Sequence, residues 1–207
     1  MRPPRTVVAA LMAVALTAGA LAVAGPVLAR HPAAPHHYGA GIEPLSGYEP
    51  QTTCNPRAKP GVVAFGNLLA ATWPKRSTVG TSRACSVGGT SEHKEGRALD
   101  WMVSAGDAAD RRKVDNLMEW LLATDRHGNA YAKARRLGIQ YMIWNRRIWR
   151  AYSADSGWQP YTGSVPHTDH VHFSFSWRGA RQDTSFWTGT TSDEARSLRV
   201  DGERASR

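Results

Sequence analysis

Two segments of the chain, residues 97–103 and 170–176, alternate apolar and polar residues in the way that is typical of half-buried β-strands. The apolar positions are Leu99, Trp101 and Val103 in the first strand and Val171, Phe173 and Phe175 in the second. The opposite face carries Asp100 in the first strand and His170 and His172 in the second. We therefore expect each strand to turn one face to the core and to keep a carboxylate or imidazoles on the other.

Other segments predict helices and a hairpin. Apolar residues recur at helical spacing after Asp107 and Asp110, at Val114, Leu117, Met118 and Leu121. Further helices are expected over 62–71 and 129–136, a strand over 79–83, and a hairpin of 139–144 with 147–152. Strands and helices that follow one another without a repeating β-α-β period predict an α+β domain, with a central antiparallel sheet and flanking helices.

The first 29 residues have the pattern of an export signal. Arg2 and Arg5 precede an uncharged apolar run over 7–23, and the small residues before position 30 suit cleavage after Ala29. The alternative is an uncleaved anchor, because a run of this length approaches what a bilayer-spanning helix needs. Whether this segment is cleaved or stays as an anchor, the domain is expected outside the cytoplasm, secreted or associated with the cell wall.

The chain has 207 residues, 42% of them hydrophobic, which is enough for one globular domain with a sizeable core. Residues 30–51 are rich in Pro, Gly, Ala and His without an apolar period, and predict a linker. The polar and charged residues 189–207 predict a flexible tail. The folded domain is therefore expected over 52–188.

Cys54 and Cys85 are the only cysteines, and an even count in an exported chain favours a disulfide. Closing a loop of this size would restrict the unfolded chain by about 3 to 4 kcal/mol. A nucleophilic cysteine is disfavoured, since neither residue has a histidine beside it in the sequence. We expect both cysteines to be structural.

The formal net charge of +9 indicates attraction to anionic partners. The basic residues are scattered and no RNA- or DNA-binding motif accompanies them, so no nucleic-acid partner is expected. An anionic cell wall suits an exported basic protein better. Membrane association is expected only if the export signal stays attached.

Two histidines and an aspartate are the leading candidates for chemistry. His93 precedes Asp100, with Gly96 allowing a turn between them, and His172 lies on the last predicted strand. Two imidazoles and a carboxylate are a ligand set suited to a catalytic zinc ion, Zn²⁺, that keeps one position open. The alternative is that Asp100 pairs with Arg97 or with backbone donors, while the histidines are ordinary core or surface groups.

The run from Gly89 to Asp100 resembles the Ser-x-His-x-x-Gly-x-Ala-x-Asp signature of the D-alanyl-D-alanine metallopeptidase family. The matching positions are Ser91, His93, Gly96, Ala98 and Asp100, and His172 matches the third zinc position. That family includes vancomycin-resistance carboxypeptidases and phage endolysins, and belongs with lysostaphin and the hedgehog signalling domain in one fold superfamily. The chain is also similar to a branch of small secreted fungal and actinobacterial domains. The resemblance covers most of 80–176 and implies a hedgehog/D,D-peptidase-like fold.

The resemblance also implies a general base shortly before His172. Some relatives carry Glu or Asp three residues before the last zinc ligand, which is Asp169 here, whereas the lysostaphin and hedgehog side carries His two residues before it, which is His170 here. We prefer Asp169 because the upstream motif is of the peptidase type, and both stay candidates. His167 either orients a ligand or is an exposed loop residue.

Two further residues follow from the resemblance. Residues 80–83 look like a shortened form of the family's Gly-Tyr-Arg-Ser segment, which makes Arg83 the candidate for stabilising the oxyanion of the transition state. The alternative for Arg83 is a surface ion pair with Glu43 or Glu92. Ser91, as the first residue of the signature, is expected to contact the substrate.

Together these features imply an exported, zinc-dependent metallopeptidase of the D,D-carboxypeptidase or endopeptidase type, acting on amide bonds in peptidoglycan peptides. The alternative is a non-catalytic, zinc-bearing module that binds the cell wall or another polyanion, as the hedgehog domain illustrates for this fold.

Overall fold

The computed structural model describes residues 30–74 and 78–197, so the predicted export signal lies outside the described residues. Within them the chain is α+β, as predicted. The helices are α1 (Pro60–Thr72), α2 (Ala108–Leu122), α3 (Ala132–Leu137), α4 (Trp177–Ala180) and α5 (Ser185–Thr188), with two 3₁₀ helices, η1 (Glu92–Glu95) and η2 (Ala151–Ser156). The strands are β1 (Val79–Gly80), β2 (Ala98–Met102), β3 (Ile139–Trp144), β4 (Arg147–Arg150), β5 (Gln159–Pro160) and β6 (His170–Phe175).

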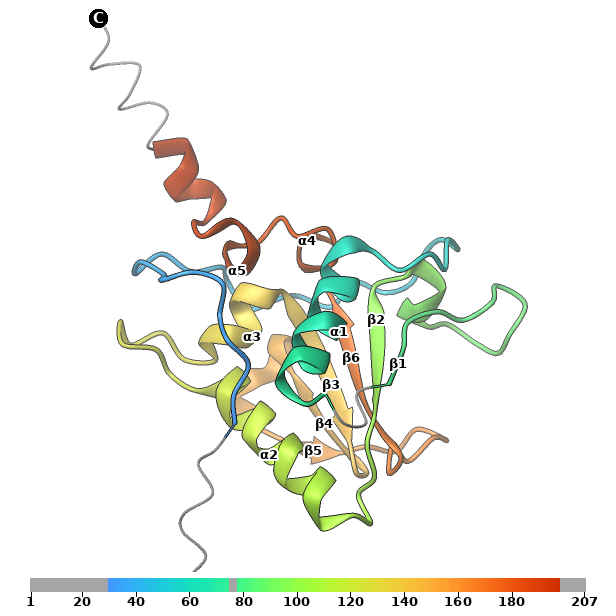
Figure 1. Ribbon diagram of the computed structural model, residues 1–207. Helices are drawn as coiled ribbons and strands as arrows, with labels where there is room; N and C mark the ends of the chain where they lie inside the picture. The colour runs from blue at the N-terminus through green and yellow to red at the C-terminus, as the bar shows by residue number, and fades with distance from the viewer. Residues whose placement is uncertain (1–29, 75–77, 198–207) are drawn as a thin grey trace, which may run out of the picture.

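The six strands form one antiparallel sheet in the order β1-β2-β6-β3-β4-β5. The predicted hairpin of β3 and β4 is confirmed, with Trp144 paired to Arg147 around the turn. The last strand, β6, inserts between β2 and β3, so the centre of the sheet joins segments that are far apart along the chain (Figure 1).

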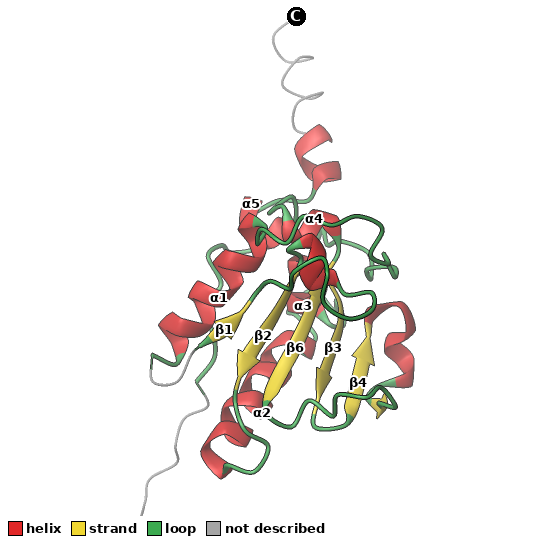
Figure 2. Cartoon of the chain, turned by 90° about the vertical axis from the view of Figure 1, so that its right-hand side faces the viewer, coloured by secondary structure: helices red, strands yellow, loops and turns green. Residues whose placement is uncertain are grey.

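Helices α1 and α2 cover one face of the sheet, and the other face is turned to the viewer in Figure 2. The covered face carries the apolar residues of the two alternating strands: Leu99, Trp101, Val171 and Phe173 are fully buried, as predicted. Phe65 of α1 packs edge-on against Phe173, with 5.1 Å between ring centroids. The core therefore lies between the helices and the sheet, and the opposite face carries Asp100 and His172.

The two long helices begin where local chemistry favours it. Pro60 occupies the first turn of α1, where its fixed φ suits a helix and its missing N–H costs nothing. Asp107 caps α2 by accepting hydrogen bonds from the backbone N–H groups of Ala109 and Asp110, at 2.7 and 3.0 Å. Among the described residues, no helix is long and apolar enough to cross a membrane.

The predicted linker over 30–51 contains no helix or strand, but several of its side chains bind the domain. Tyr38 is buried and its hydroxyl donates to the carbonyl oxygen of Phe186. The Glu43 carboxylate, only 5% exposed, accepts hydrogen bonds from both the backbone N–H and the hydroxyl of Ser185, each at 2.6 Å. These contacts depend on single polar side chains, which produce no periodic pattern.

The predicted tail also begins with structure. Residues 192–197 are helical, and Glu194 accepts hydrogen bonds from the backbone N–H and the hydroxyl of Thr191 at the start of that turn. This reciprocal capping satisfies donors that a frayed end would leave to water. Residues 198–207 lie outside the described part of the chain.

The loop between α2 and α3 provides a test of stability against pH. Burial would raise the pKa of Asp125, but hydrogen bonds from the side chain and backbone of Asn129, the backbone of His127 and the side chain of Arg136 lower it to about 2 from 3.8. A depressed carboxyl pKa stabilises the fold above the unfolded value and ceases to do so as the pH falls through the folded value.

We expect Asp125→Asn to lower the free energy of unfolding by about 2 kcal/mol at pH 7, with the loss shrinking between pH 4 and pH 2. Denaturant unfolding at several pH values measures this, with Asp155→Asn, at an exposed position, as the control. A loss that is the same at pH 7 and pH 2.5 would contradict the assigned role of the charge.

Candidate metal centre

Strand register places Asp100 beside His172. Asp100 of β2 pairs directly with His172 of β6, and His172 pairs directly with Ile143 of β3. Directly paired residues in an antiparallel sheet project to the same face, so these side chains form a row across the sheet. On its other side Asp100 pairs with Gly80 of β1, which adds no side chain to the row.

His93 reaches the row from a 3₁₀ helix that ends in a tight turn. Gly96 closes η1 with φ of 67°, in the left-handed region that glycine tolerates best. A Cβ at Gly96 would lie 1.9 Å from the carbonyl oxygen of Arg57, so no other residue fits there without displacing the backbone. The expected turn at Gly96 is therefore present, and it returns the chain to β2.

A buried ion pair between Arg97 and Glu95 stabilises the turn at Gly96. Arg97 donates from Nε to Glu95 Oε2 at 2.7 Å, and both side chains are fully buried. Glu95 Oε1 also accepts hydrogen bonds from the backbone N–H groups of Thr52 and Thr53. Arg97 thus pairs with Glu95, and the alternative pairing with Asp100 is excluded.

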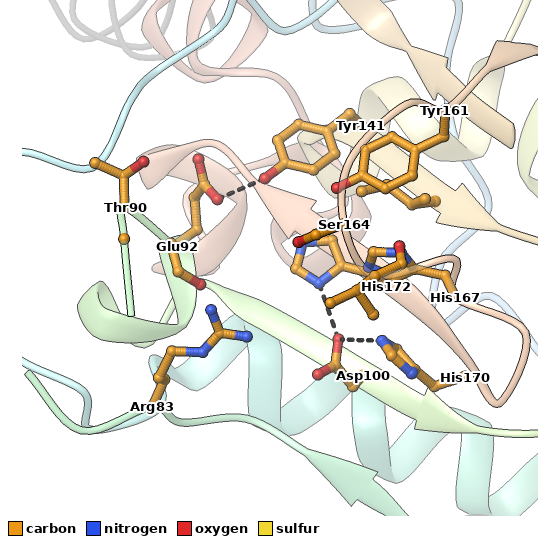
Figure 3. A pocket seen from close by; sticks show the side chains of 14 residues that line it. Arg83, Thr90, Glu92, Asp100, Tyr141, Tyr161, Ser164, His167, His170 and His172 are labelled. Atoms are coloured by element: carbon orange, nitrogen blue, oxygen red, sulfur yellow. Dashed lines mark hydrogen bonds and ion pairs between the residues drawn. The ribbon is translucent and has the colours of Figure 1, made fainter. Parts of the chain in front are cut away.

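Three possible metal-ligand atoms, one each from His93, Asp100 and His172, lie close together. Asp100 Oδ1 lies 2.8 Å from His172 Nδ1 and 3.1 Å from His93 Nε2, and the two histidine nitrogens lie 3.2 Å apart (Figure 3 shows Asp100 and His172). One atom from each of the three residues falls within 4.8 Å of the others, so His93, Asp100 and His172 could hold a metal ion. The donor set fits zinc, which binds imidazole nitrogen and carboxylate oxygen.

The electrostatics of Asp100 and His172 favour metal binding. Burial would raise the pKa of the Asp100 carboxyl, but hydrogen bonds from His172 and His93 hold it well below its usual range. Burial lowers the pKa of His172, although its hydrogen bond to Asp100 opposes the shift. An ionised carboxylate and a neutral imidazole are the forms that bind a metal, so at neutral pH few protons have to be displaced.

The cluster borders a pocket of about 330 Å³ on the face of the sheet opposite the buried residues Leu99 and Trp101. Asp100, His170 and His172 line it together with Arg83 and Ser91, the predicted oxyanion and substrate residues. Figure 3 shows the guanidinium of Arg83 directed into this space. Within the described part of the chain Arg83 has no ion-pair partner; Glu43 instead binds Ser185, and Glu92 binds Tyr141.

The two candidate general bases, His170 and Asp169, differ in their position relative to the pocket. His170 lines the pocket, with Nε2 3.7 Å from Asp100 Oδ1. The Asp169 side chain is 75% exposed and does not line the pocket; its Oδ1 lies 2.8 Å from His170 Nδ1, on the outer side of the ring. The geometry therefore favours His170 next to the ligands and Asp169 as the residue that orients its ring, the reverse of the preference drawn from the motif.

His167 lies on the loop between β5 and β6, but its side chain is buried and lines the pocket. Its ring centroid is 4.7 Å from that of His170 and 5.8 Å from that of His172. Burial, and then the neighbouring His172 and His170, lower its pKa to about 4, so the ring is neutral at neutral pH. Its φ of 51° is unusual for a residue other than glycine, and its Nδ1 lies 2.6 Å from the carbonyl oxygen of Val165. Backbone strain of this kind is typical of functional sites.

Two residues of the pocket, Glu92 and Tyr141, were not among the predicted site residues. The Tyr141 hydroxyl donates to Glu92 Oε2 at 2.5 Å, and the Tyr141 ring stacks on that of His172 with centroids 5.5 Å apart. Tyr141 reaches this face because a bulge in β3 shifts the register between Ile139 and Tyr141. Burial, followed by the charge of Glu92, raises the pKa of Tyr141, which keeps its proton on the hydroxyl.

The predicted disulfide between Cys54 and Cys85 is confirmed, and it links two parts of the site. Cys85 follows Arg83 closely in the loop after β1. Cys54 is followed by Asn55, whose backbone N–H donates to the carbonyl oxygen of Lys94 in η1. The bond therefore ties the loop that carries Arg83 to the helix that carries His93.

We expect reduction of this bond to lower the melting temperature, because the loop of 31 residues that it closes corresponds to about 3 to 4 kcal/mol of unfolded-state entropy. Native protein should react with a thiol reagent only after reduction. The Cys54→Ser/Cys85→Ser double variant, scanned with and without reductant, is the control. Two reactive thiols in native protein would contradict the assignment.

Comparison with known proteins identifies one family. A family model described as the VldE C-terminal domain matches residues 54–172, more than half of the chain. No curated protein matches the chain, and no solved structure matches it. The matched region begins at the first cysteine of the disulfide and ends at His172, so it contains all three residues of the metal cluster. The chain belongs to the family of the VldE C-terminal domain.

Proposed function

We propose that this protein is an exported, zinc-dependent peptidase that hydrolyses amide bonds in peptidoglycan peptides. The observation that carries the proposal is the convergence of His93, Asp100 and His172 beside a pocket that Asp100 and His172 line. Two imidazoles and one carboxylate leave a position of a zinc ion free, which is the arrangement of catalytic and not of structural zinc sites. The resemblance of residues 89–100 to the D-alanyl-D-alanine metallopeptidase signature supplies the substrate class.

When bound, zinc supplies Lewis-acid activation of water and of the amide carbonyl. In the proposed mechanism His170 takes a proton from the attacking water at Nε2 and passes it to the leaving amine. Asp169, hydrogen-bonded to Nδ1, keeps the ring of His170 in the orientation that this transfer needs. Arg83 stabilises the negative charge that develops on the carbonyl oxygen, and Ser91 contacts the substrate.

The disulfide supports the proposed location outside the cytoplasm, since such bonds persist in oxidising compartments. The net charge, +9 for the whole chain and +7 without Arg2 and Arg5 of the predicted export signal, adds a second argument, because it favours retention on an anionic cell wall.

The decisive experiment incubates the zinc-loaded protein with purified peptidoglycan and analyses the released fragments by mass spectrometry. New amino or carboxyl termini are expected, and they would identify the scissile bond and separate carboxypeptidase from endopeptidase activity. Protein treated with a chelator is the control. If zinc-loaded protein binds the wall but releases no fragment from any peptidoglycan tested, the non-catalytic binding module replaces the enzyme.

A further inference from the structure

Glu92 is an acidic residue of the pocket wall that the proposed mechanism does not use. It precedes the metal-cluster residue His93 in sequence, and it is only 4% exposed. Its carboxylate lines the same pocket as Asp100 and His172 (Figure 3). One of its oxygens, Oε2, accepts the hydrogen bond from Tyr141 at 2.5 Å, and the stacking of Tyr141 on His172 fixes the carboxylate relative to the cluster.

No cation neutralises this carboxylate among the residues that the structure describes. Its second oxygen, Oε1, accepts no hydrogen bond from them, and no lysine or arginine lies within ion-pair distance. Arg83 lines the same pocket without pairing to it, and Lys94, two residues on, donates instead to the carbonyl oxygen of Gly88. A carboxylate that lines a pocket and has no cationic side chain beside it can bind a cationic ligand there.

We propose that Glu92, held by Tyr141, binds a protonated amine of the substrate beside the metal cluster. This inference rests on the proposed function, because the amine belongs to the peptide that is cleaved. A primary ammonium matches the site chemically: it offers hydrogen-bond donors only, and Oε1 is a free acceptor. Two amines of a free peptidoglycan peptide have this chemistry, the α-amine at its amino terminus and the side-chain amine of its diamino acid.

The test uses three forms of the peptide L-Ala-D-Glu-L-Lys-D-Ala-D-Ala: unmodified, acetylated at its amino terminus, and acetylated at the lysine Nζ. Titration calorimetry of the zinc-loaded full chain at low temperature measures the dissociation constants, and mass spectrometry checks that the peptides stay intact. Acetylation of the recognised amine is expected to weaken binding about 10- to 100-fold, the range of a hydrogen bond to a charged group. The form that binds weakly identifies which amine is recognised.

In Glu92→Gln, which keeps the size of the side chain and an acceptor for Tyr141, the unmodified peptide is expected to bind as weakly as the acetylated one. Tyr141→Phe should lose part of the discrimination, since the carboxylate is no longer held. Asp155→Asn, which removes an exposed carboxylate of η2, controls for the change in net charge. Zinc content and melting temperature show whether each variant is folded.

The proposal is overturned if the wild-type protein binds the three peptides equally or binds none of them, or if Glu92→Gln keeps the preference. The proposed function fails separately. Discrimination between the peptides without cleavage of any would leave the amine site and remove the hydrolase, whereas cleavage without discrimination would do the opposite.

Discussion

Replacing His172 by alanine is expected to remove most of the zinc and to abolish hydrolysis. The substitution leaves one imidazole and one carboxylate, which bind zinc poorly. Loss of a residue that only orients a ligand typically costs 10- to 100-fold in metal affinity, so loss of the ligand itself should exceed about 100-fold. Elemental analysis of purified protein measures this directly, with close to one zinc per chain expected for the wild type.

His37→Ala is the matched control, because His37 lies in the exposed N-terminal segment and should not affect zinc content. Stoichiometric zinc in a variant with alanine at all three positions, His93, Asp100 and His172, would refute the metal centre. A variant that keeps its zinc but has lost its activity would instead place the catalytic role of His172 outside metal binding.

The second large effect is expected at His170. Since this residue is not among the three ligands, His170→Ala should keep the zinc and lower kcat about 10²- to 10⁴-fold, the usual contribution of a general base. Asp169→Asn should cost less, about 10-fold in kcat with little change in KM, because Asp169 acts only by orienting His170. Steady-state kinetics on a peptide that the enzyme cleaves, together with zinc analysis, measure both variants.

A larger loss in Asp169→Asn than in His170→Ala would return the base to Asp169, as the upstream motif suggested. Equal losses would show that the two residues act as one unit, and the double variant would then be no worse than either single variant.

Much of the candidate metal centre was predictable because the large core residues of β2 and β6 alternate with the residues of the opposite face. In such strands a period of two separates core residues from the rest, so Leu99 and Val171 identified the faces that carry Asp100 and His172. The turn at Gly96 and the pairing of Cys54 with Cys85 were likewise visible in residue type and count. What periodicity could not give is which strands are neighbours, and the structure supplies this by inserting β6 beside β2.

Tyr141 was not predictable as a residue of the pocket. Ile139 pairs with the core residue Phe175, so strict alternation would place Tyr141 on the core face as well. The bulge adds one residue, Gln140, whose side chain amide donates to Ser174 Oγ and to the carbonyl oxygen of Phe175. A buried glutamine in a strand is a weak signal of a bulge, and only the three-dimensional contacts explain it.

The identity of the general base could not be predicted from the sequence for a different reason. Asp169 and His170 are adjacent in sequence, and spacing from His172 admits both. Which of them enters the pocket depends on where β6 begins, and β6 begins at His170, so Asp169 remains in the preceding loop. Strand ends are the least regular part of a sequence pattern, because they are set by pairing with neighbours and not by local propensity.

The position of β6 has a consequence for the order in which the protein matures. Asp100 and His172 are 72 residues apart in sequence and become neighbours only when the last strand enters the sheet between β2 and β3. Contacts between such distant segments form late in folding, since the entropy of closing the intervening chain must be lost first. A chain still being synthesised, or one truncated before β6, presents only His93 and Asp100. Under the proposed function, acquisition of the metal marks completion of the sheet, and no active intermediate precedes it.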